Sequence, residues 1–140
     1  CTIFDNVVIE GFPMKVKIGD YTNVQSGTVI HGLDDSDTII GKYCTIGHNS
    51  LVHGATLEDY VTIGLGSTVM GKSILRKGTF VGANALITEN KEFEERSMII
   101  GVPGEVTKIL PEKAIDKAKQ VAEKYVLYGN LLGEQLKRID

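Results

Sequence analysis

The chain has 140 residues, of which 42% are hydrophobic and 24% are charged, and its formal net charge is −3. This balance indicates one globular domain with a real core, not a disordered chain. The acidic charge argues against nucleic acid or an anionic membrane as a partner, because both require a basic face, and no apolar run is long enough to span a bilayer. Two cysteines are too few for a disulfide framework, so we expect a reducing compartment and a cytoplasmic location.

The first 17 residues predict an irregular coil, because Gly11 and Pro13 interrupt short β-favouring runs. An aliphatic residue then returns about every six positions, often followed by glycine. Its steps are six residues long, apart from one of ten (40 − 30) and one of five (57 − 52). So short a period, kept up to residue 87, indicates a repeat architecture. The series is Ile18, Val24, Ile30, Ile40, Ile46, Val52, Leu57, Ile63, Val69, Leu75, Val81 and Ile87.

A six-residue unit suits one short strand and one corner, so three units close a triangular coil of about 18 residues. Two positions before each aliphatic residue stands a smaller one, and alternation turns both inward. These residues are Thr22, Thr28, Thr38, Cys44, Ser50, Val61, Ser67, Thr79 and Ala85. We expect the glycines after the aliphatic residues to supply the backbone freedom of the corners. The pattern resembles the left-handed parallel β-helix of hexapeptide-repeat proteins, and the hand is taken from that resemblance because spacing does not give it.

We expect a mostly-β domain of about five coils over residues 1–110. The repeat fades after Thr88 into a charged loop, followed by a short strand at Met98–Ile100 and a Gly-Val-Pro-Gly turn. Pro111 suits a first helical position. Residues 111–140 predict an amphipathic α-helix of six or seven turns, packed on the β-helix or on a neighbouring subunit. Its apolar face comprises Ile115, Ala118, Ala122, Tyr125, Leu132 and Leu136.

All three histidines, His31, His48 and His53, lie in the middle of the repeat. His31 follows Ile30 and His53 follows Val52, so both occupy the same place in the repeat. They are 22 residues apart (53 − 31), and the long step between them adds four (10 − 6), which leaves 18, one full coil. We therefore expect the two imidazoles to stand above one another on one outer edge, ~4.8 Å apart at the backbone, within reach of one metal ion.

His48 precedes His53 by five residues, about a third of a coil, so it projects from a different edge and can hardly reach the same ion within one chain. A three-fold trimer would bring the edge with His48 to the edge with His31 and His53 of the next subunit. Three neutral nitrogens with an open fourth position are typical of a catalytic zinc-type site, where water ionises near neutral pH to give a hydroxide nucleophile. Three unrelated surface histidines are the alternative, but they would not explain the shared place in the repeat.

The order of NVQSGTVIH, IGHNSLVHG, a GVPG turn and a C-terminal helix resembles the gamma-class carbonic anhydrases over nearly the whole chain. The resemblance implies a lyase that reversibly hydrates CO2 to bicarbonate. It implies a homotrimer with Zn2+ between subunits, with Fe2+ or Co2+ as alternatives. His31 and His53 match the metal ligands from one chain, and His48 matches the ligand from the next.

Three further residues match family positions to which we assign catalytic roles. Asn23-Val24-Gln25 matches an Asn-x-Gln motif, whose neutral glutamine can orient hydroxide or the substrate oxygen without titrating. Gln25 should face the edge of His48. Tyr125 matches a tyrosine of the C-terminal helix that can approach the site. An interfacial hydrogen bond for Gln25 and a buried helix position for Tyr125 are the structural alternatives.

The chain departs from the family where Arg-Gly-Asp usually stands, because these places hold Glu10-Gly11-Phe12. Ser26 also replaces an aspartate that often follows the glutamine. In the family these residues form ion pairs between subunits beside the metal. Exchange of the whole network can be nearly neutral, whereas loss of one partner is costly. We expect metal binding to survive and Glu10 to lie near the metal, as a proton acceptor or as a group that raises the pKa of the bound water.

Simpler interpretations hold elsewhere. The stretch Asp34–Asp37 could be a proton-shuttle loop, but its composition favours a solvated turn. Cys44, in a small inward position, should be a packed and inert thiol. Two other functions stay open: a hexapeptide acyltransferase with a histidine base and coenzyme A, and a non-catalytic metal-binding or scaffold relative. The changes at Glu10, Phe12 and Ser26 favour the latter of these two.

Overall fold

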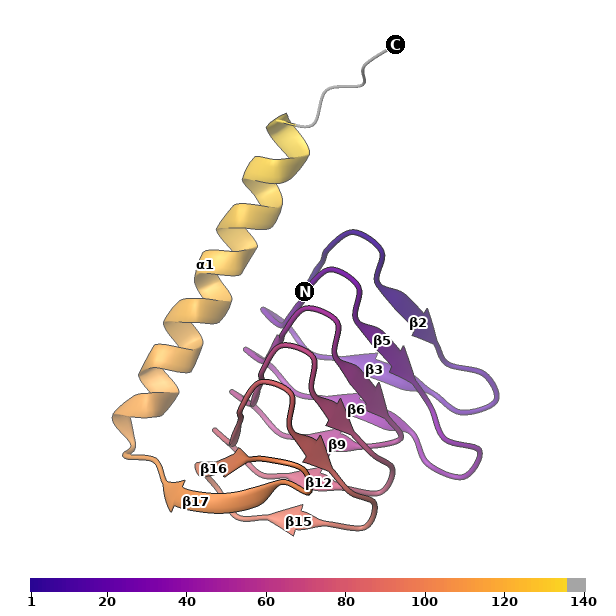
Figure 1. Ribbon diagram of the computed structural model, residues 1–140. Coiled ribbons are helices and arrows are strands. Elements are labelled where there is room, and N and C mark those ends of the chain that lie inside the picture. Colours follow the sequence, from indigo (N-terminus) through magenta and orange to yellow (C-terminus); the bar gives the residue numbers. More distant parts are fainter. Residues whose placement is uncertain (136–140) are drawn as a thin grey trace.

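A computed structural model of the chain describes residues 1–135 as a three-sided stack of short strands with one long helix along its side (Figure 1). Each coil contributes one strand to each of three sheets, called here sheets A, B and C. Neighbouring strands within a sheet come from successive coils and pair in parallel, except for the last strand of sheet A. The prediction of a parallel β-helix of about five coils with a C-terminal helix is therefore confirmed.

The strand bounds follow the six-residue period. Sheet A comprises β1 (Thr2–Ile3), β4 (Asn23–Val24), β7 (Thr45–Ile46), β10 (Thr62–Ile63), β13 (Phe80–Val81), β16 (Ser97–Ile100) and β17 (Glu105–Ile109). Sheet B comprises β2 (Val8–Glu10), β5 (Val29–His31), β8 (Leu51–His53), β11 (Thr68–Val69) and β14 (Leu86–Ile87). Sheet C comprises β3 (Val16–Ile18), β6 (Thr38–Ile40), β9 (Thr56–Leu57), β12 (Ile74–Leu75) and β15 (Glu92–Phe93).

The core is the inward row of the repeat. Every aliphatic residue of the series from Val24 to Ile87 is at most 2% exposed, and the small residues two positions earlier are buried as well. The parallel register places equivalent residues of successive coils above one another, so that Val24, Ile46 and Ile63 form one row on sheet A. Burying each such side chain contributes roughly 1.5–3 kcal/mol. The stacked rows therefore hold the coils together although the strands from β1 to β15 are only two or three residues long.

The corners do not obtain their backbone freedom from the glycines after the aliphatic residues, so that expectation is wrong. Positive φ lies two residues further on, for example at Tyr43 (φ 55) and Gly66 (φ 66). Gly47 and Gly64 are required for a different reason. A Cβ at Gly47 would lie 2.8 Å from the carbonyl oxygen of Ile63, and a Cβ at Gly64 would lie 2.5 Å from the amide nitrogen of Ala83. These glycines allow the backbones of successive coils to approach each other.

The repeat extends further at both ends than predicted. Residues 1–18 form a regular coil with β1, β2 and β3 on the three sheets, not an irregular one. The predicted charged loop before Met98 is also wrong, because β15 continues sheet C and places Phe93 against the core. The expected strand at Met98–Ile100 is part of β16. After the predicted turn, β17 pairs with β16 in antiparallel orientation, which the periodicity did not indicate.

Helix α1 (Lys113–Gln135) begins beside β17 and runs along the stack toward the first coil (Figure 1). Its main contacts are with β1, β4 and β7 of sheet A, so it packs on its own coil. Of the predicted apolar face, Ala122 is fully buried and Leu132 is 37% exposed, while Leu136 lies outside the described residues. No helix within residues 1–135 has the length and apolarity required to cross a bilayer.

Candidate metal centre

His31 and His53 form a stacked pair on the edge between sheets B and C. Each is the last residue of its strand, next to an inward aliphatic residue, and the parallel register pairs the two directly. Their ring centroids are 5.0 Å apart and the ring planes differ by 14°. The one-coil offset calculated from the sequence is therefore confirmed. Metal binding by these residues stays a prediction.

The backbone that carries this pair is tied together by Thr38, one of the small inward residues. Its hydroxyl donates to the carbonyl oxygen of His31 at 2.6 Å and accepts from the amide of Gly54 at 2.8 Å. The amide of Gly54 also donates to the carbonyl oxygen of His31 at 3.0 Å. Sequence reasoning assigned Thr38 only to the core. Its polarity at an inward position near the end of the long step was the available signal.

Glu10 lies one coil before His31, at the equivalent place on β2. The register pairs the two residues, and the Glu10 carboxylate oxygen Oε2 is 3.8 Å from Nε2 of His31. The Glu10 side chain is 66% exposed and that of His31 is 29% exposed. The edge therefore carries a carboxylate and two imidazoles on three consecutive rungs. Glu10 therefore stands beside His31, and its expected place near a metal ion stays a prediction.

His48 lies on a different edge, in the corner between β7 of sheet A and β8 of sheet B. Its side chain is exposed and the next residue, Asn49, has positive φ (φ 55). Within residues 1–135, no three histidine, cysteine, aspartate or glutamate side chains come together closely enough to hold a metal ion. A single chain thus provides the pair on one edge and the third imidazole on another, which is the arrangement that the spacing predicts.

Asn23 and Gln25 form a buried amide network near the edge of His48. Asn23 is fully buried and Gln25 is 3% exposed. Nδ2 of Asn23 donates to Oγ1 of Thr45 at 2.9 Å and to the carbonyl oxygen of Cys44 at 3.2 Å. Nε2 of Gln25 donates to Oδ1 of Asn23 at 3.2 Å. Asn23 therefore fixes the orientation of the Gln25 amide.

Tyr125 lies on α1 against the first coil, away from the stacked histidines. Its ring contacts that of Phe4 edge to face, with centroids 5.8 Å apart and planes at 85°. Phe4 follows β1 and pairs through its amide with the carbonyl oxygen of Val24, so Tyr125 stands near the corner that contains Gln25. The structure thus places Tyr125 on the sheet A side, together with Gln25 and not with the His31–His53 pair.

The acidic stretch after His31 is a structural turn. Leu33 and Ser36 form an isolated bridge, and a carboxylate oxygen of Asp37 accepts from the amide of Lys15 at 2.9 Å. Asp35 pairs with Lys72 at 2.6 Å. These contacts agree with the solvated-turn interpretation of Asp34–Asp37.

Cys44 is fully buried, and its Sγ lies 3.2 Å from the carbonyl oxygen of Glu58. Burial raises the pKa of this thiol to about 12. The folded chain therefore keeps Cys44 protonated and unreactive at neutral pH, because the thiolate is the nucleophile. This agrees with the expectation of an inert core residue.

The donor set suits a zinc-type ion. Imidazole nitrogens are common zinc ligands, and a stacked pair of histidines can direct two of them to one point. Within residues 1–135, the charged partner of the pair is Glu10, and carboxylates near metal-binding histidines commonly orient them. His31, His48 and His53 are the residues that would hold the ion.

Comparisons with known proteins agree with this geometry. No family model matches the chain. A Methanocaldococcus jannaschii protein named "Probable carbonic anhydrase" is 39% identical over 131 residues, which cover 94% of this chain and 82% of the relative. "Gamma carbonic anhydrase 1, mitochondrial" of Arabidopsis thaliana is 30% identical over 130 residues, and the match spans 89% of this chain but only 47% of that protein.

A solved structure shares the fold as well. The crystal structure of a hexapeptide transferase family protein from Anaplasma phagocytophilum superimposes with a TM-score of 0.86 at 31% identity, and covers 91% of this chain and 75% of that one. The stacked coils, the histidine pair on one edge and the extent of the sequence match all point the same way. The chain belongs to the gamma-class carbonic anhydrase family of hexapeptide-repeat proteins.

Proposed function

We propose that this chain is a gamma-type carbonic anhydrase, a lyase that reversibly hydrates CO2 to bicarbonate as a homotrimer. A Zn2+ ion, or Fe2+ or Co2+, would be held by His31 and His53 of one subunit and by His48 of the next. The observation that carries the proposal is the stacking of His31 on His53 at 5.0 Å while His48 occupies a different edge. Two ligands on one edge and one on another fit an ion shared between copies of the chain.

The face between the two histidine edges supports assembly through sheet B. Its outward row begins with apolar residues, of which Val8 is 52% exposed and Val29 is 37% exposed, and Leu51 follows in the same register. Exposed apolar stripes of this kind are typical of interaction surfaces. A closed ring of three copies would cover this face and bring unlike edges of neighbouring subunits together.

The ion would supply an activated water near neutral pH, because coordination to zinc lowers the pKa of water toward 7. The chain supplies the positioning. Gln25, held by Asn23, presents a neutral amide at the edge of His48 and can orient an oxygen of the substrate. Glu10 places a carboxylate 3.8 Å from Nε2 of His31, where its negative charge favours a bound cation.

Two other functions make different predictions. The Anaplasma relative is named a transferase, and an acyltransferase would bind coenzyme A on the same fold. A non-catalytic metal-binding relative would keep the ion without turnover, and the carboxylate of Glu10 beside His31 is the observation that favours it.

Metal analysis combined with stopped-flow CO2 hydration separates the three functions. The carbonic anhydrase proposal predicts one metal ion per subunit and hydration well above the uncatalysed rate. Metal without hydration would support the non-catalytic relative. Absence of metal, together with a raised melting temperature in coenzyme A, would support the acyltransferase.

The sharing of the site between subunits is tested by mixing variants. His48→Ala and His53→Ala homotrimers should each lose the metal. A mixed trimer places an intact His31–His53 edge against an intact His48 edge at one of its three interfaces, so it should regain about one ion. Thr88→Val is the matched control, because Thr88 lies on the same edge two rungs beyond His53. Failure of the mixed trimers to regain metal, with both homotrimers folded, would contradict a site shared between subunits.

A further inference from the structure

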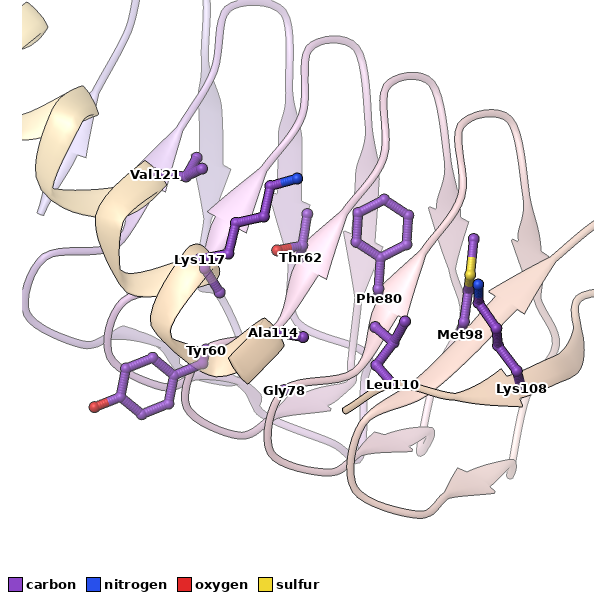
Figure 2. Close-up of a pocket in the computed structure, with 11 residues that line it drawn as sticks. Tyr60, Thr62, Gly78, Phe80, Met98, Lys108, Leu110, Ala114, Lys117 and Val121 are labelled. Atoms are coloured by element: carbon purple, nitrogen blue, oxygen red, sulfur yellow. The ribbon is translucent and has the colours of Figure 1, made fainter. Parts of the chain in front are cut away.

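Helix α1 does not cover sheet A evenly, and a groove remains under its N-terminal half. The main contacts of α1 are with β1, β4 and β7. Over β10, β13 and β16 the helix and sheet enclose a groove of about 330 Å³, shown in Figure 2. This volume lies at the lower end of the range for small-molecule sites.

The outward residues of sheet A explain why the helix stands closer at one end. At the close end, a Cβ added to Gly129 would lie 2.4 Å from Cγ2 of Thr2, so helix and strand are in direct contact. At the open end the same outward row carries the larger side chains of Phe80 and Met98, and the helix opposite presents Ala114 and Ala118. Large residues on the sheet opposite small ones on the helix leave a trough between them.

The floor and walls of the groove are mainly apolar. Figure 2 shows Thr62, Phe80 and Met98 on successive strands, projecting from the face of the sheet beside the helix. Leu110, in the segment between β17 and α1, and Val121 of the helix also line the groove. Phe80 and Met98 are only half-buried, so an apolar ligand could still remove part of their surface from water.

Two lysines give the groove its charge. Lys117 extends from the helix and Lys108 from β17, and both line the groove. Within residues 1–135 neither takes part in an ion pair, whereas Lys72 and Lys119 each have a carboxylate partner. An apolar trough with two unpaired ammonium groups is complementary to a molecule that has an apolar chain and an anionic head.

We propose that this groove binds a medium-chain carboxylate, with its head group at Lys117 and its hydrocarbon chain running over Phe80 to Met98, while Lys108 at the far end adds to the positive charge of the groove. At about 30 Å³ per water-sized group, the groove holds roughly ten such groups, which suits a chain of eight to ten carbons. Lysine is a point charge on a flexible stem and can follow a carboxylate head without a fixed geometry. The site is separate from the histidine edges and does not depend on the proposed hydration activity.

The three methionines allow a site-specific test. The metal-loaded protein, labelled with carbon-13 at its methionine methyl groups, is titrated with sodium octanoate and followed by NMR. Met98 lines the groove, while Met14 and Met70 lie elsewhere on the coil and serve as internal controls. We expect a saturable shift of the Met98 methyl alone. Decanoate should bind about fourfold more tightly per added methylene.

The charge requirement is tested with ligands and variants of equal length. Octanoate should bind more tightly than 1-octanol, and octylammonium should bind least. Lys117→Gln should weaken octanoate by about two- to fivefold, as expected for an exposed ion pair, and Lys108→Gln should weaken it by less, while Lys91→Gln, next to β15, should leave the affinity unchanged. Ala118→Phe should fill the groove and abolish binding. The lysine variants keep the test valid if Ala118→Phe lowers the melting temperature.

Three results would overturn the proposal. Equal shifts of all three methionine methyl groups would indicate non-specific association of the hydrocarbon chain. Octylammonium binding as tightly as octanoate would exclude the role of the lysines. A change in molecular mass on Ala118→Phe would show that a second copy of the chain occupies the groove. Metal content and CO2 hydration should stay unchanged in the lysine variants, so the outcome is independent of the histidine site.

Discussion

Sheets A and B belong to the same coils, yet their outer faces have opposite character. The outward row of sheet A carries Asn23 and Thr45, which are polar but at most 7% exposed because α1 lies over them. The corresponding row of sheet B carries Val8 and Val29, which are apolar but exposed. Within the described residues the helix covers the polar part of sheet A at β4 and β7, while the apolar residues of sheet B at β2 and β5 stay exposed.

The two sheets differ in how far one chain covers their outer faces. Buried polar groups are tolerated only when they are hydrogen-bonded, and Asn23 meets this requirement through Thr45 and Cys44. At β4 and β7, sheet A is therefore complete within one chain. Sheet B lies between the edge with His48 and the edge with His31 and His53, and within residues 1–135 a single chain leaves its outer face uncovered. The difference points to a second subunit on sheet B, which the following predictions test.

The largest effect is expected from charge on the open face. Val29→Glu should convert the proposed trimer to monomers and remove essentially all of the proposed metal, because a carboxylate in a buried interface is strongly unfavourable. Light scattering and metal analysis measure both outcomes. Ile39→Glu is the matched control, because Ile39 is 38% exposed on sheet C, close to the 37% of Val29. If Val29→Glu stays trimeric, sheet B is not the interface.

A smaller effect is expected from Glu10, which stands at the edge of the same face. Glu10→Gln removes a negative charge next to the imidazole pair, so metal affinity should fall by about five- to tenfold while the trimer persists. Competition with a chromophoric chelator measures the affinity. The same change at Glu112, in the segment that leads into α1, should have no effect. Unchanged affinity in Glu10→Gln would place this carboxylate outside the influence of the metal.

The inward half of this molecule could be predicted from sequence and much of the outward half could not. Inward residues repeat every six positions, so Ile30, Val52 and the coil offset of the histidines follow from counting. The segments that cover the outer faces of the sheets do not follow the repeat. The position of α1, the strand β17 and the groove beneath the helix depend on contacts between distant segments.

The glycines show the same limit. A glycine after an aliphatic residue is visible in the sequence, but the sequence does not say whether it serves positive φ or close approach. Here it is close approach at Gly64, while the positive φ falls on residues as bulky as Tyr43. The continued repeat through Phe93 was missed because an aromatic residue replaced an aliphatic one among glutamates.

The covered face can be tested with two glycines of α1. Gly129→Ala should lower the free energy of unfolding by ~1 kcal/mol, because the added methyl overlaps Thr2 and this strain exceeds the gain in helix propensity. Gly133→Ala should raise it by roughly 0.5–1 kcal/mol, because within residues 1–135 no atom beyond the adjoining helix backbone lies within 4 Å of the new Cβ. Urea unfolding measures both variants. Equal effects would mean that α1 does not pack closely on the first coil.

The smallest effect concerns Cys44, beneath the covered face. Its pKa is raised by burial from 9.0 to about 12, so above pH 9 the unfolded chain releases a proton that the folded chain keeps. Stability should then fall as pH rises from 9 toward 12, and below pH 9 the thiol contributes no pH dependence. Between pH 8 and 9.5 the wild-type protein should lose up to ~1 kcal/mol more than Cys44→Ala, measured by urea unfolding. Thiol labelling at pH 8 provides the control, because the exposed Cys1 should react at once and Cys44 only after unfolding. Rapid labelling of both thiols in the folded protein would show that the coil opens readily at this level, and the tight inner stack would then have to be reconsidered.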